Sequence, residues 1–435
     1  MNYFIKSLVW LRRRVFFRIV QRTLVMLMPV ATIGAIFQLL RDELFSPDSL
    51  IYNIFNFDQN MSNQVWNAGN VITQGMIQVT IGIFGIYVAY FAAVYTARLY
   101  RKDSTMAGIA AVIVITFCSY LSEATRNAGN NRAVFYSRML NINGTLLAII
   151  IGYLVGQVFH YLGKDYVRST FEHTDRIRHR AWNALLPTSV AILFGLIIGI
   201  IIYLFKIRLL DSYYITSLAT KLQNSNNLLV IIPLTVIVSL LWWFGIGYPI
   251  SALTTASNSG AAIANLNYAL RHGNSYNVPY KYLGSAMINS YVLMVIFALA
   301  MVIILYTKQK EIEAVSKINL IPVTFGATNG FFIGLPIILN PIYFVPIVFL
   351  PVVNELFAAA AIKLHIIMPT AYPVLSGSPS LLYSFFGTNG NWATFIFTVV
   401  LFIFDVGVLI PTVKIAQEIS EKVLAYDKEE DKYAK

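Results

Sequence analysis

The chain has 435 residues, of which 57% are hydrophobic and 12% charged, and its formal net charge is +12. This balance excludes an ordinary soluble protein, and apolar runs of about 20 residues recur, so the sequence predicts an all-α polytopic membrane protein. Lys and Arg occupy short loops between the apolar runs, which argues against a nucleic-acid partner, and with Cys118 as the one cysteine and no Cys/His cluster we expect no disulfide framework, metal or cofactor.

Residues 1–23 are predicted to form an amphipathic basic helix on an anionic, cytoplasmic lipid surface, because basic and apolar residues alternate there. A signal peptide is the alternative, but the charged region is long and no small-x-small cleavage site follows. The basic residues of this segment are Lys6, Arg12, Arg13, Arg14, Arg18 and Arg22.

About ten membrane spans are predicted after this segment. Loop 42–70 carries four acidic residues and no Lys or Arg, whereas loops 98–105 and 164–182 are basic. The positive-inside rule therefore supports a cytoplasmic N-terminus, although the basic loop 122–143 does not follow it. The topology after residue 248 stays open, and the charged tail 414–435 is expected in the cytoplasm. The predicted spans are residues 24–41, 71–97, 106–121, 144–163, 185–206, 228–247, 284–306, 331–350, 352–368 and 392–412.

Two apolar segments, residues 240–249 and 328–341, are interrupted by Gly, Pro and polar residues. A Thr/Ser/Asn-rich stretch follows the first. Unwound backbone at membrane depth normally lines a cavity, and in transporters it holds the substrate. The alternatives are that Trp residues here belong to an interfacial belt and that Asn residues cap freed backbone groups. The predicted substrate-binding residues are Trp243, Tyr248, Thr254, Thr255, Asn258, Asn329 and Asn340.

Several sequence strings resemble a known family. They are WWFGI at 242–246, FIGLPIILNPI at 332–342, PTAYP at 369–373, GTNGNW at 387–392, MPV with IGAIF in the first span, and NINGT at 141–145. In this order they are similar to the membrane-spanning IIC subunit of the bacterial phosphotransferase system, in its lactose, cellobiose and diacetylchitobiose family.

The resemblance implies a homodimer in the bacterial cell membrane that moves a disaccharide or oligosaccharide by alternating access. Residues 24–207 would form the dimerisation scaffold, residues 208–412 the substrate domain with two re-entrant hairpins, and residues 413–435 a cytoplasmic tail. In the family a IIB protein, supplied with phosphate through IIA, phosphorylates the sugar. No such domain is expected within this chain, so both partners would be separate proteins.

Three positions depart from the family pattern. Gly247 stands where the family has His, Gly330 where it has Glu, and Val374 where many members have Trp. The missing Glu is the group expected to polarise the sugar hydroxyl. The resemblance therefore leaves open a facilitator or sensor that binds sugar without phosphorylation.

Glu355 lies in an apolar run and is a candidate to replace the missing Glu, with a place near an interface or a pairing with Lys363 as alternatives. A membrane acyl- or glycosyltransferase would need a His or Asp pair at membrane depth, and the sequence offers none.

Overall fold

The computed structural model describes residues 2–127, 133–165, 174–209, 224–245, 259–335 and 337–433. Within these ranges the regular secondary structure is helical, apart from an isolated parallel bridge between Ser49 and Ser376. Eight segments are long and apolar enough to cross a membrane, which confirms the predicted all-α membrane class. They are Val15–Leu44, Asn63–Leu99, Ser104–Ser122, Ile142–Leu162, Ile177–Leu204, Gly284–Tyr306, Pro341–Lys363 and Trp392–Tyr426.

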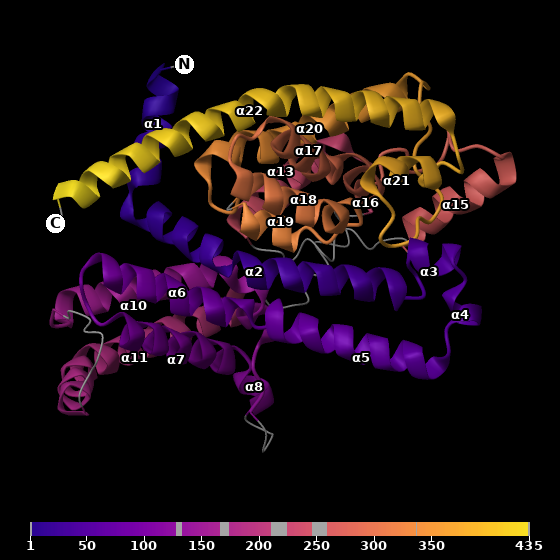
Figure 1. The fold of residues 1–435 in the computed structure, drawn as a ribbon. Coiled ribbons are helices and arrows are strands. Elements are labelled where there is room, and N and C mark those ends of the chain that lie inside the picture. The colour runs from indigo at the N-terminus through magenta and orange to yellow at the C-terminus, as the bar shows by residue number, and fades with distance from the viewer. Residues whose placement is uncertain are drawn as a thin grey trace.

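The first half of the chain forms one group of helices, most of which lie below α2 in Figure 1, while its N-terminal helix lies above α2. Its elements are α1 (Asn2–Arg13), α2 (Val15–Leu44), α3 (Leu50–Ile54), α4 (Phe57–Asn60), α5 (Asn63–Thr80), α6 (Phe84–Leu99), α7 (Ser104–Ser122), α8 (Ala124–Asn127), α9 (Ser137–Leu140), η1 (Ile142–Gly144), α10 (Thr145–Leu162) and α11 (Thr174–Leu209).

Small residues let α6 and α10 pack closely. Gly152 lies against Ala92 and the backbone of Ala89, and Gly156 lies against Thr96. Close approach through small residues is how membrane helices gain van der Waals contact, because lipid leaves little hydrophobic driving force between them. Asp103 caps α7 and holds Arg180 of α11 by two hydrogen bonds of 2.6 and 2.9 Å. The group is therefore fixed at its core and at one end.

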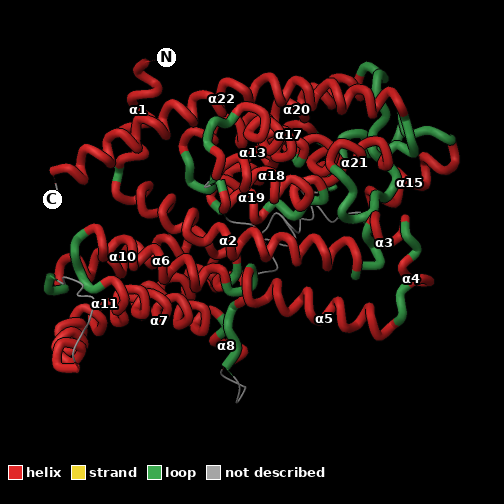
Figure 2. Tube along the Cα trace, viewed as in Figure 1, coloured by secondary structure: helices red, strands yellow, loops and turns green. Residues whose placement is uncertain are grey.

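The second half forms the group above α2, and α2 packs against both groups through α5, α6, α18 and α19 (Figure 1). Loops gather around α3, α15 and α21 (Figure 2). The elements are α13 (Leu228–Phe244), α15 (Gly260–His272), α16 (Gly284–Met287), the π-helix η3 (Ile288–Val292), α17 (Met294–Tyr306), α18 (Lys310–Thr324), α19 (Asn329–Gly334), α20 (Pro341–Lys363), α21 (Ser380–Gly387) and α22 (Trp392–Tyr433).

The division of residues 331–368 into two spans is wrong. The chain forms the six-residue α19, a turn, and then the single helix α20, which continues through Pro346 and Pro351. Proline removes one helical hydrogen bond, but neighbouring helices tolerate it in membrane proteins, and both prolines are buried against such neighbours. The helix instead begins at Pro341, where the missing N–H costs nothing, and Asn340 caps it.

The N-terminal segment also ends earlier than predicted. Helix α1 stops at Arg13, Arg14 is extended, and residues 15–23 belong to the long helix α2. Ile5 and Leu8 of α1 pack with Ile342 and Ile419, so α1 rests on α20 and α22. The basic segment is therefore a short helix held by the core rather than one that ends at residue 23.

Candidate functional site

A cavity of about 580 Å³ lies where α2, α19 and the ends of α5, α13 and α18 meet. Its wall carries many amide and hydroxyl groups and few charges. Polar residues in the wall come from both halves of the chain: Gln38, Arg41, Gln78, Ser137, Asn141, Asn143, Asn289, Thr324, Thr328, Asn329, Ser378, Ser380 and Tyr383. Neutral hydrogen-bonding groups in this number suit a ligand with many hydroxyls.

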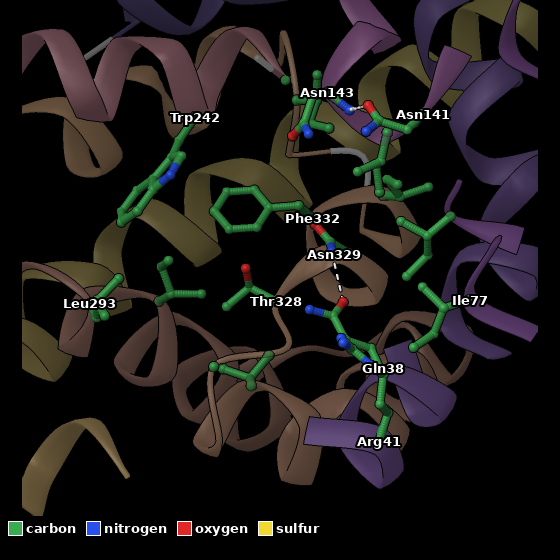
Figure 3. Close-up of a pocket in the computed structure, with 18 of the residues that line it drawn as sticks. Gln38, Arg41, Ile77, Asn141, Asn143, Trp242, Leu293, Thr328, Asn329 and Phe332 are labelled. Atoms are coloured by element: carbon green, nitrogen blue, oxygen red, sulfur yellow. Dashed lines mark hydrogen bonds between the residues drawn. The ribbon is translucent and has the colours of Figure 1, made fainter. Parts of the chain in front are cut away.

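Aromatic rings flank the polar groups. Figure 3 shows Trp242 of α13 at the left of the view and Phe332 of α19 in the middle, with Asn141 and Asn143 farther to the right. Arg41 is the one charged residue in the part of the wall that the structure describes, and it pairs with its neighbour Asp42 at 3.2 Å. No carboxylate lines this described part of the wall.

Asn329 is placed in the cavity by the short helix α19. Its Nδ2 donates to Oε1 of Gln38 on α2 at 3.0 Å, the dashed contact in Figure 3. One turn further along α2, Arg41 donates to Oδ1 of Asp42 at 3.2 Å. The Asn329–Gln38 contact fixes the Asn329 amide between the two halves of the molecule. A ligand that contacts Asn329 is therefore coupled to the position of α2.

Asn289 enters the cavity from η3. Its Nδ2 donates to the Tyr383 hydroxyl at 3.2 Å. Burial raises the pKa of Tyr383, which keeps the phenol protonated and leaves its own proton for another acceptor. π-Helical turns are frequent at functional sites because the extra residue redirects a side chain.

A second, smaller cavity of about 50 Å³ shares Asn289 and Tyr383 with the first. Val374 lines it, beside Tyr372 and Pro373. Position 374, at which the sequence pattern led us to expect Trp, therefore adjoins the main cavity without lining it. The Asn289–Tyr383 hydrogen bond forms the wall between the two cavities.

Trp243 and Asn340 lie outside the cavity wall. The Trp243 indole N–H donates to the backbone oxygen of Asn340 at 2.9 Å, and the Leu339 N–H donates to the Trp243 oxygen at 2.9 Å. The Asn340 side chain accepts from Ile342 N at the start of α20. Both residues join the end of α13 to the turn before α20, while the neighbouring Trp242 takes the cavity position.

Gly330 points away from the cavity. A Cβ at this position would overlap Oδ1 of Asn319 and approach Ala35 of α2. Glu355 does not line the cavity either, because its carboxylate accepts a hydrogen bond from Thr235 at 2.6 Å within the protein. Neither position 330 nor the Glu355 carboxylate therefore lines the cavity.

The other predicted positions, Gly247, Tyr248, Thr254, Thr255 and Asn258, lie outside the described residues. Asn329 is the one predicted residue among those described that lines the cavity, and Gln38, Asn289 and Tyr383 line it without having been predicted. Gln38 and Asn289 could have been predicted as functional candidates, because each is a polar residue within an apolar span. Asn141 and Asn143 belong to the NINGT string that resembled the family.

The model of the phosphotransferase system EIIC family matches residues 21–351. The chain is similar to the cellobiose-specific EIIC component of Lactococcus lactis subsp. lactis, with 27% identity over 126 residues, 29% of this chain and 26% of that protein. It is also similar to the oligo-beta-mannoside-specific EIIC component of Bacillus subtilis, with 21% identity over 296 residues and 67% of each chain. The first match thus spans about a quarter of that relative's length.

Among solved structures, the chain is similar to ChbC, the IIC component of the N,N'-diacetylchitobiose-specific phosphotransferase system. The sequence identity is 17%, the TM-score is 0.41, and the superposition covers 96% of each chain.

Proposed function

Because this chain belongs to the phosphotransferase system EIIC family, we propose that it is a sugar permease of the bacterial cell membrane that carries a disaccharide or short oligosaccharide. The observation that carries the proposal is the cavity of about 580 Å³ with its amide and hydroxyl wall beside Trp242 and Phe332. Its size lies within the range of small-molecule pockets. Sugars present hydroxyls at the ring edge and apolar faces, which these two kinds of group match.

The proposed substrate class is a β-linked disaccharide or oligosaccharide. Support comes from the relatives, which are named for cellobiose and oligo-beta-mannoside. Residues 208–412 would carry the sugar, residues 24–207 would form the scaffold of a homodimer, and the tail 413–435 and the N-terminus would face the cytoplasm.

Phosphate would come from separate IIA and IIB proteins, as in the family. The absence of a carboxylate from the described part of the wall favours a second candidate, a protein on the same fold that binds or passes sugar without phosphorylation. The two candidates differ only in whether uptake requires these partners.

Sugar binding to the purified protein tests the shared part of the proposal. We expect cellobiose or a β-mannobiose to raise the melting temperature, and the variants Asn329→Ala and Trp242→Ala to lose the effect. The exposed residues Asn60 and Trp182 supply matched controls, because Asn60→Ala and Trp182→Ala remove the same chemical groups away from the cavity. If no β-linked sugar stabilises the protein, the permease proposal is wrong.

Uptake into proteoliposomes then separates the two candidates. A phosphotransferase component should accumulate phosphorylated sugar only when IIA, IIB and phosphoenolpyruvate are supplied on the cytoplasmic side. A facilitator should equilibrate unmodified sugar without them.

A further inference from the structure

Three fully buried polar side chains lie deep in the second half of the chain, outside the cavity. Asn354 and Glu355 are on α20 and Asp405 is on α22, and each has 0% of its surface exposed. Both helices are long and apolar enough to span a membrane. Carboxyl groups at such depth are costly and are usually kept for a function.

Asp405 and Asn354 form a direct pair. Asn354 Nδ2 donates to Asp405 Oδ2 at 2.9 Å and to the backbone oxygen of Tyr291 at 3.3 Å. The remaining oxygens, Asp405 Oδ1 and Asn354 Oδ1, are buried and have no hydrogen-bond partner. Glu355 has a different partner, because its Oε2 accepts from the Thr235 hydroxyl of α13 at 2.6 Å, while its Oε1 is also buried without a hydrogen-bond partner.

The Asp405–Asn354 pair has one hydrogen too few to satisfy its two unpartnered oxygens. Among the described residues no Lys, Arg or His forms an ion pair with Asp405, so an ionised carboxylate would be buried without compensation. A proton on Asp405 removes that charge and turns the carboxyl group into a donor. The amide oxygen of Asn354, on the same side chain that already binds Asp405, is an acceptor that has no donor.

The pair is connected to the cavity through η3. Asn354 binds the backbone oxygen of Tyr291, and Asn289, two residues earlier in the same π-helix, lines the cavity and binds Tyr383. Any movement of η3 that shifts Asn289 also shifts the carbonyl that holds Asn354. The cavity and the Asp405–Asn354 pair are therefore joined through one short π-helix.

We propose that the Asp405–Asn354 pair is a proton-binding site and that sugar binding in the cavity takes up a proton there. The inference rests on the proposed function, because it needs a sugar in the cavity. Linkage is reciprocal, so protonation of the pair tightens sugar binding and the affinity falls as the pH rises.

Asp405 is the one ionisable side chain of α22 between Trp392 and Val413. Helix α1 packs near Ile419, beyond Asp405 along α22. The titratable groups on η3 and on the elements that pack against α22 are Tyr291 on η3, Tyr306 on α17, Tyr343, Glu355 and Lys363 on α20, Tyr383 on α21, and Tyr3, Lys6, Arg12 and Arg13 on α1.

The test measures cellobiose affinity of the full-length protein from pH 5 to pH 9, in the native chain, in Asp405→Asn and in Glu355→Gln. We expect the native affinity to fall by up to about tenfold per pH unit where the pair titrates, which is the limit for one linked proton. Asp405→Asn should bind sugar with little dependence on pH. Glu355→Gln, the matched removal of the neighbouring buried carboxyl, should keep the native dependence.

Proton uptake itself is measured on the native protein alone, with a pH indicator in weakly buffered detergent solution, so the test stands if Asp405→Asn does not fold. Cellobiose should take up a proton, up to one per protein, where the affinity depends on pH. The proposal is overturned if sugar binding to the native protein is independent of pH, or if sodium at constant pH replaces the proton. It is also overturned if the pH dependence survives in Asp405→Asn or disappears in Glu355→Gln. Absence of sugar binding at every pH would instead overturn the proposed function, and this inference with it.

Discussion

At the residue scale, Gly330 shows how a substituted motif position is built into the surrounding packing. The sequence pattern led us to expect Glu where this chain has Gly330, and here the space that a side chain would enter is filled by Asn319 and Ala35. Asn319 itself is buried, and its Oδ1 has no partner. A side chain at position 330 and the Asn319 side chain therefore compete for the same space.

We expect Gly330→Glu alone to destabilise the protein by about 1–3 kcal/mol, because it overpacks the contact between α2, α18 and α19. The double variant Gly330→Glu with Asn319→Ala should recover much of this loss, since the smaller residue opens the space. Thermal unfolding followed by intrinsic fluorescence measures both, with Asn319→Ala alone as the control. Equal melting temperatures for the single Glu variant and the native chain would contradict the packing argument.

Tyr383 offers a test of the wall between the two cavities. Tyr383→Phe removes the hydroxyl that accepts from Asn289 and that can donate to a sugar, so the affinity for the best disaccharide should fall about three- to tenfold. Titration calorimetry measures the change. Tyr161→Phe, at a 79% exposed position, is the matched control and should bind as the native chain does.

At the element scale, the end of α13 places one of two adjacent tryptophans in the cavity wall and the other against the turn before α20. Gly245 ends the helix in a left-handed conformation with φ of +74°, which an L side chain adopts only with strain. Trp242 then lines the cavity while Trp243 ties α13 to the turn before α20. The sequence favoured Trp243 as the ligand contact, because a string of letters does not show which face of a helix end meets the cavity.

Substitution of each tryptophan by Phe should separate these roles. Trp243→Phe loses the hydrogen bond to Asn340 and should cost about 1 kcal/mol of stability with sugar affinity retained. Trp242→Phe should keep the stability and weaken sugar binding. Melting temperature and calorimetry on the same two preparations check the pair, and the reversed pattern would return Trp243 to the site.

Much of the helical pattern followed from apolar runs, and the exceptions have physical causes. The prolines of α20 looked like boundaries, but buried neighbours stabilise an unbroken helix there. The cavity was less predictable. Asn329 was marked by a broken apolar segment, whereas Gln38 of α2 is 291 positions from Asn329 and enters the site only because α2 packs against α19. The polarity of each residue alone does not reveal that these two distant side chains meet in the folded protein.

At the scale of the whole molecule, α2 and the loop after it connect the two halves. The bridge between Ser49 and Ser376 is held by two backbone hydrogen bonds of 3.0 Å, from Leu50 N to the Ser376 oxygen and from Ser376 N to the Asp48 oxygen. Alternating access, as proposed, requires one half to move against the other. During such a motion the short bridge would either break or keep its two segments moving together.

A disulfide tests that requirement. Neighbouring extended segments lie about 4.8 Å apart, within reach of a cystine, and the native Cys118 is buried and cannot interfere. The double variant Ser49→Cys with Ser376→Cys should keep sugar binding but lose uptake under oxidation, and reductant should restore uptake. Each single variant should transport normally under both conditions. Full uptake by the oxidised double variant would show that the bridge moves as part of one body.

Helix α22 has a geometric consequence for how the molecule sits in its surroundings. A helix of 42 residues is about 63 Å long, roughly twice the thickness of a bilayer's hydrocarbon core. Its apolar part must stop near the headgroups, so the charged remainder extends beyond them as a rigid rod. Helix α1 packs against this rod, where the Arg13 guanidinium stacks on the Tyr426 ring. The rod makes the depth of the whole protein sensitive to membrane thickness, because a thicker bilayer would draw in charged turns that a thinner one leaves in water.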